Sequence, residues 1–173
     1  MSKLGRYLLN AEEFTKTADR IQQDLEDNLA QCPDDLAPAL HVVVVTPEKQ
    51  RKVMLFVIYG AFNDEDAKHE VLRRLGQQLR ANELLPIAAF LACECWTSLQ
   101  RAADPYIQPS QDPLRQEAVL IFGLSADRGL NALRSMKIGR CDERIIPTRF
   151  ENHDGEINES PLLASFYRGF AGM

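Results

Sequence analysis

Two charged residues in otherwise apolar segments are the strongest candidates for chemistry in this sequence. Glu94 shares one face of a predicted strand with Phe90 and Trp96. A carboxyl group in such surroundings can have a raised pKa and can act as a general acid or base. Arg134 is the one charged residue on an apolar strand face and could anchor an anion. These two residues are weak catalytic candidates, and the sequence indicates no others.

Each candidate also has a purely structural interpretation, which we favour in both cases. Glu94 could point outward and form a charge ladder with Glu117, Lys137 or a neighbouring arginine. Surface carboxylates greatly outnumber catalytic ones. Arg134 could pack its aliphatic stem against the sheet and extend its head group past the sheet edge into water.

The common motifs of enzymes and metal sites do not occur in the sequence. There is no GxxxxGK[ST] or GxGxxG phosphate loop, and the segment beginning at Gly123 has Asp127 where a nucleophile elbow requires glycine. Cys93 and Cys95 point to one side of a predicted strand, where core packing is favoured over metal ligation. The sequence therefore favours a protein that is not an enzyme, with no metal and no cofactor.

Composition and charge narrow the possible function classes further. The chain has 173 residues, 45% of them hydrophobic and 26% charged, as in globular domains. A net charge of −5 argues against a dedicated nucleic-acid binder. The longest apolar run, Leu84 to Cys93, is shorter than the roughly 20 residues of a membrane span. The start of the chain lacks the apolar region of a secretory signal, so we expect a cytoplasmic protein without a membrane partner.

Hydrophobic periodicity and capping signals predict the order of helices and strands. A capping box at Asn10 and Glu13 indicates the start of the first helix, and Asn63 is the expected cap of the second. Pro147 assigns the last strand to a sheet edge. The predicted helices are 11–30 and 64–81, and the predicted strands are 40–46, 52–59, 86–98, 115–124, 130–140 and 144–150.

This order, α-β-β-α-β-β-β-β, predicts an α+β fold for a single domain over residues 1–150. We expect a mainly antiparallel sheet of five to six strands with two helices on one face. The first hairpin is apolar on both faces, so it should be covered on both sides. Alternation in the next hairpin favours pairing Leu124 with Leu130. Residues 151–173 form a tail that docks on its own domain or on a partner chain.

Excess apolar sheet surface is the main functional signal. Large apolar patches are seldom left in water, and twofold self-association is a common way to cover them. The sequence therefore predicts a homodimer and a non-catalytic interaction or assembly module, with a protein partner possible and nucleic acid disfavoured. The alternative is a small enzyme or small-ligand binder with a site between the 99–113 loop and the sheet. The predicted interface residues are Phe90, Trp96, Val119, Ile121, Leu133, Phe166 and Tyr167.

Overall fold

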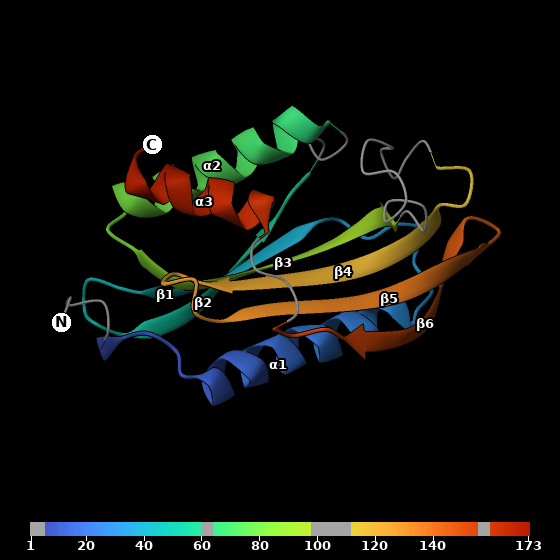
Figure 1. The fold of residues 1–173 in the computed structure, drawn as a ribbon, viewed down its shortest axis with the longest axis horizontal. Helices are drawn as coiled ribbons and strands as arrows, with labels where there is room; N and C mark the ends of the chain where they lie inside the picture. The colour runs from blue at the N-terminus through green and yellow to red at the C-terminus, as the bar shows by residue number, and fades with distance from the viewer. Residues whose placement is uncertain (1–5, 60–63, 98–111, 156–159) are drawn as a thin grey trace.

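The computed structural model describes residues 6–59, 64–97, 112–155 and 160–173 and contains one curled antiparallel sheet (Figure 1). The six strands lie in the order β2-β1-β3-β4-β5-β6. The predicted fold class and element order are confirmed, and a helix, α3, follows them. The elements are α1 (Ala11–Leu29), β1 (Ala39–Val45), β2 (Arg51–Val57), α2 (Glu65–Ala81), β3 (Leu85–Thr97), β4 (Gln116–Ser125), β5 (Asn131–Cys141), β6 (Arg144–Asn152) and α3 (Pro161–Ala171).

Helices cover both faces of the sheet (Figure 1). The stripe of α1 that contains Phe14 and Ile21 packs on one face, in a core shared with β1, β3, β4, β5 and β6. Helices α2 and α3 pack together on the other face, around Leu72 and Phe166. The structure thus has two helices on one face, but the predicted 11–30 helix lies on the opposite one. The reason is that β1 and β3 bury residues on both sides.

The first helix begins where the sequence predicts. Asn10 accepts a hydrogen bond from the backbone N–H of Glu13 at 2.9 Å, and the Glu13 carboxylate accepts one from the N–H of Asn10 at 3.0 Å. This capping box satisfies two of the N–H groups that a helix start leaves without partners. The second helix is capped by Asp64, not Asn63, through a hydrogen bond from Ala67 N–H at 2.9 Å.

The end of the predicted tail forms α3 (Pro161–Ala171), which packs on the chain's own α2. Ser160 caps α3, Pro161 occupies its first turn and Gly172 ends it in the left-handed region. Serine followed by proline, and then apolar residues at three- and four-residue steps, is the signal that could have predicted this helix. Within the parts of the chain that the structure describes, no helix is long and apolar enough to cross a membrane.

The hairpin of β4 and β5 differs from the predicted register by one residue. Leu124 lies opposite Asn131, and the hairpin closes between Ser125 N–H and the Leu130 carbonyl at 2.9 Å. The Ser125 hydroxyl also accepts from Leu130 N–H at 2.9 Å. The predicted Leu124–Leu130 pair is therefore wrong, because side-chain alternation was used without the hydrogen bonds of the turn. The correct register places Val119 and Ile121 under α1.

Candidate functional site

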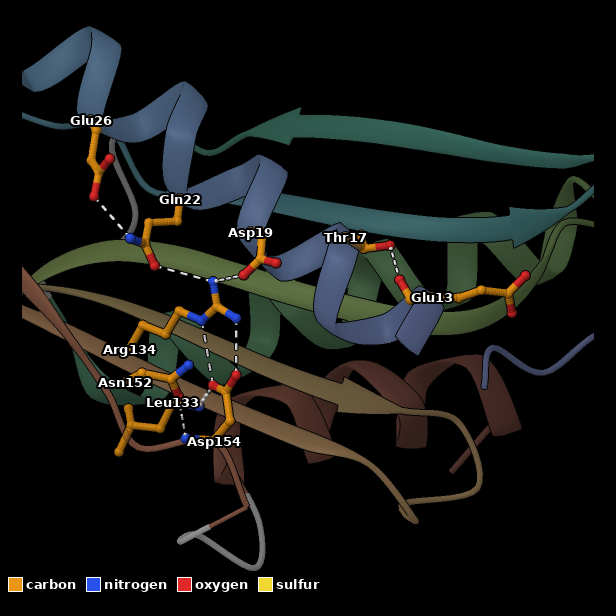
Figure 2. A network of polar contacts seen from close by, with 9 residues as sticks. All are labelled: Glu13, Thr17, Asp19, Gln22, Glu26, Leu133, Arg134, Asn152 and Asp154. Carbon is orange, nitrogen blue, oxygen red and sulfur yellow. Dashed lines mark hydrogen bonds and ion pairs between the residues drawn. The ribbon is translucent and has the colours of Figure 1, made fainter. Parts of the chain in front are cut away.

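Arg134 lies inside the protein, with 2% of its side chain exposed, and joins three separate segments (Figure 2). Its guanidinium donates to Asp19 at 2.7 Å, to the Gln22 side-chain oxygen at 3.1 Å and to Asp154 at 2.9 Å. Asp154 also accepts from the Leu133 N–H at 3.1 Å. The interpretation favoured from the sequence places the head group past the sheet edge in water. In the structure the head group does not reach bulk water. Its donors tie α1 to the turn after β6, so the structure gives Arg134 a role in packing.

Glu94 belongs to a different ion cluster on the same face. It pairs with Arg140, which also donates to Glu117 at 2.8 Å and to the Asp34 carbonyl at 2.7 Å. The Glu94 carboxylate accepts from the Leu36 N–H at 3.3 Å. These contacts fasten the segment after α1 to the sheet. Glu94 and Arg134 are thus each engaged by their own partners and do not form a common site.

The cysteine pair lies on the other face, where burial keeps both thiols protonated. Desolvation raises the pKa of Cys93 to about 12 and that of Cys95 to about 11. A thiol in this state is a poor nucleophile and a poor metal ligand. Among the described residues, no group of three His, Cys, Asp or Glu side chains could hold a metal ion. The 98–111 segment lies outside the described residues, so the alternative site beside the 99–113 loop stays a prediction.

The residues predicted to form an interface are largely covered by the chain's own helices. Phe90, Val119 and Ile121 are fully buried in the core beneath α1. Phe166 is buried between α3 and the sheet, and the partly buried Tyr167 donates to the Leu124 carbonyl at 2.8 Å. The face that the sequence assigned to a second copy is therefore not available in this fold, because α1 occupies it.

The two remaining residues of that set are at least partly accessible but are not joined in one surface. Leu133 is half-buried on the α2 and α3 face, because the register places it opposite Phe122. Trp96 is 40% exposed near the end of β3, and the Arg115 guanidinium lies over its ring at 4.6 Å.

The uncovered apolar surface lies instead on β2. Val53, Leu55 and Val57 alternate along this strand, Tyr59 follows two residues after its end, and the four are 60%, 57%, 41% and 81% exposed. We call these four residues the β2 stripe. They lie on the α1 face, since Val53 is opposite Val43, which belongs to the core beneath α1. Among the described residues, no residue of β2 belongs to that core. The sequence predicted that both faces of the first hairpin are covered. This prediction is confirmed for β1 and is wrong for β2, whose residues on the α1 face are exposed.

The two edges of the sheet differ in how they are protected from pairing with another strand. Edge strand β6 contains Pro147, a register shift opposite Met136 to Ile138, and exposed charges such as Arg149. Natural proteins use these features to prevent association at sheet edges. Edge strand β2 has no proline, no break in its pairing with β1, and no charge from Val53 to Tyr59. Among the described residues, no strand pairs with its outer side.

The outer side of β2 presents backbone hydrogen-bonding groups. Ile58 N–H donates to the Pro38 carbonyl at 2.8 Å, and the Gln50 carbonyl accepts from Thr46 N–H at 2.9 Å. The even-numbered residues of β2 therefore direct their backbone groups toward β1. Because these directions alternate in an antiparallel strand, Val53 and Leu55 direct theirs outward. An edge with outward-directed N–H and C=O groups is a template for pairing with another strand.

A groove of about 430 Å³ runs beside this edge, on the side of the sheet that carries α2. Phe56 and Ile58 line it from the strand, and Val71 and Leu75 line it from α2. The outer edge of β2 therefore has apolar surface on both sides of its backbone, and the two surfaces are continuous because Leu55, Val57 and Tyr59 of the β2 stripe also border the groove.

No protein-family model, curated protein or solved structure matches this chain. The interpretation of the β2 edge therefore depends on its geometry and chemistry alone.

His41 lies opposite Leu55 of the β2 stripe and gives a pH-dependent prediction. Burial lowers its pKa, and the Asp24 carboxylate opposes this effect. Since the pKa is lower in the folded than in the unfolded state, the stabilisation is complete above the unfolded value near 6.5 and is lost as the pH falls through the folded value. We expect the free energy of unfolding, measured by urea denaturation, to decrease from pH 7.5 to 5. His41→Gln should flatten this dependence, and an unchanged slope would contradict the assignment.

Proposed function

We propose that this chain is a non-catalytic assembly module that self-associates through β2. The observation that carries the proposal is the contrast between its two edges: β6 has several features that prevent strand pairing, and β2 combines exposed apolar residues with an outer side that no described strand pairs. Covering the β2 stripe is favourable at roughly 25 cal/mol per Å² of apolar surface. The four cysteines are unpaired, which suits a reducing compartment, and we include a cytoplasmic location in the proposal.

The presence of one open edge per chain favours a closed dimer over a filament. A filament of sheets needs two different edges that pair head to tail, and β6 is poorly suited to this role. Two β2 edges can instead meet about a twofold axis, and their pairing leaves only the two β6 edges exposed. Self-association through β2 is then limited to two copies.

The test is sedimentation of the wild type and of two lysine variants across the micromolar range. Leu55→Lys places a charge in the middle of the β2 stripe, and Leu114→Lys changes an equally exposed leucine, 58% against 57%, away from β2. We expect the wild type and Leu114→Lys to sediment at twice the chain mass of 19.6 kDa. Leu55→Lys should raise the dissociation constant at least about 100-fold, because each dimer would bury two ammonium groups.

Circular dichroism provides the folding control for these variants. Leu55 is exposed in the single chain, so Leu55→Lys should retain the wild-type spectrum and melt cooperatively as a monomer. A wild-type protein that stays at 19.6 kDa at every concentration would overturn the proposal.

The alternative of a small enzyme or small-ligand binder concerns the 99–113 loop, which is mostly outside the described residues. A thermal-shift screen with metals, nucleotides and common metabolites tests it, since a compound that binds the folded state raises the melting temperature.

A further inference from the structure

We infer that two β2 strands pair antiparallel about a twofold axis at Leu55, so that one sheet continues through both copies and Arg51 of each contacts Tyr59 of the other. This inference rests on the proposed function and adds the register, the partner contacts and the symmetry. It follows from the direction of the backbone groups of β2, the positions of its charges and the apolar side chains on its two faces.

Backbone geometry restricts the register first. Residues 53, 55 and 57 direct their N–H and C=O groups outward, whereas residues 54 and 56 direct theirs toward β1. A second strand that offers the same edge must therefore pair odd-numbered residues with odd-numbered residues. This condition allows an axis at residue 53, 54, 55, 56 or 57 and excludes the axes between them.

Charge and buried area select among these axes. Arg51 and Lys52 lie together at the start of the strand. An axis at Val53 would make the two copies of Lys52 diagonal neighbours, roughly 7–8 Å apart, and like charges at such close range are unfavourable. An axis at Leu55 separates them and pairs Val53 with Val57 of the partner. It also uses all of residues 51–59, so that every member of the β2 stripe is covered in both copies.

The Leu55 axis also places a cation beside an aromatic ring. Arg51 would lie opposite the partner's Tyr59, on the same face as the β2 stripe. The Arg51 guanidinium is already held by Glu13 at 2.8 Å and by the Leu8 carbonyl at 3.1 Å. Tyr59 is 81% exposed and lacks cover from its own chain among the described residues. An arginine head group held in place can contact a ring with little loss of side-chain entropy.

The opposite side of the strand supports the same register. Met54 of one copy would lie opposite Phe56 of the other, next to the groove formed with Val71 and Leu75. A flexible methionine side chain suits an irregular apolar groove. The pairing would thus fill the groove beside α2 and cover the β2 stripe at the same time.

Disulfide cross-linking tests the register in the full chain, with Cys32, Cys95 and Cys141 replaced by serine so that only the buried Cys93 remains of the natural thiols. Residues opposite one another in a hydrogen-bonded antiparallel pair have Cα atoms about 5.5 Å apart, which a disulfide can span. Leu55→Cys should therefore form a covalent dimer on mild oxidation. Val53→Cys and Val57→Cys are matched controls that should not cross-link alone, since each thiol lies about 13 Å along the strand from its copy. A mixture of these two variants should cross-link.

The outcomes separate the register from the proposed function. A wild-type dimer whose cross-links follow another pattern overturns the Leu55 axis and leaves self-association intact, whereas a wild-type monomer removes both. The Arg51 contact has its own measurement, a double-mutant cycle on the dissociation constant with Arg51→Ala and Tyr59→Ala. We expect a coupling of about tenfold, because each dimer contains two such contacts. Additive effects would overturn the contact with Tyr59.

Discussion

Replacing Arg134 by methionine is expected to lower the free energy of unfolding by about 3 kcal/mol. The substitution keeps the aliphatic volume of the side chain. It removes the guanidinium that donates hydrogen bonds to both Asp154 and Gln22, at a position where only 2% of the Arg134 side chain is exposed. Removing one partner of a buried ion pair typically costs 3 to 5 kcal/mol, and the partial exposure of Asp154 favours the lower figure. Urea denaturation at neutral pH measures the change.

Two comparisons identify the cause of that loss. Arg140 also joins two carboxylates, but 31% of its side chain is exposed, so Arg140→Met should lower the free energy of unfolding by only about 1 kcal/mol. Asp154→Asn should have little further effect once Arg134 is removed, because the two residues act as one unit. Equal losses for the two arginine variants, or fully additive effects for Arg134 and Asp154, would contradict this account.

Gly169→Ala is expected to destabilise the protein by about 3 kcal/mol or more, although alanine is normally the better helix residue by about 1 kcal/mol. Helices α2 and α3 meet backbone to backbone at Gly76 and Gly169. A methyl group on Gly169 would overlap the Arg73 carbonyl oxygen and lie 2.7 Å from its carbonyl carbon. Backbone atoms cannot move aside as a flexible side chain can, so α3 would have to shift away from α2.

Thermal and urea denaturation of Gly169→Ala measure this effect, with Gly139→Ala as the matched control. A methyl group on Gly139 would meet its nearest neighbour, Ile146, at 4.0 Å, an ordinary contact. The Gly139 variant should therefore stay within about 0.5 kcal/mol of the wild type. If Gly169→Ala were as stable as the wild type, the close approach of α2 and α3 would not be a constraint on the fold.

Local signals were sufficient to predict most elements of this fold. The capping box at Asn10 and the apolar stripe from Phe14 to Leu29 located α1, because both depend on residues within a few turns of one another. Pro147 correctly assigned the last strand to an edge, since proline lacks the N–H that an inner strand requires. The helix α3 was missed because its apolar residues were interpreted only as a docking tail.

Long-range neighbours could not be predicted in the same way. Arg134 and Gln22 are distant in the sequence, and only the packing of α1 on β5 brings them to 3.1 Å. The pattern showed that Arg134 lies on an apolar face, but it did not show which acceptors would surround it. The partners of Glu94 depend similarly on where Arg140 and the segment after α1 lie.

The sequence by itself determined the order of the elements from α1 to β6, the apolar alternation of β2 and, through Pro147, the edge position of β6. Only the tertiary structure decided which apolar residues remain uncovered: Phe90, Val119 and Ile121 lie beneath α1, and Val53 and Leu55 are exposed. The physical reason is that the hydrophobic effect is non-directional. An apolar pattern shows that a residue gains free energy on leaving water, but the packing of the whole chain determines which segment covers it.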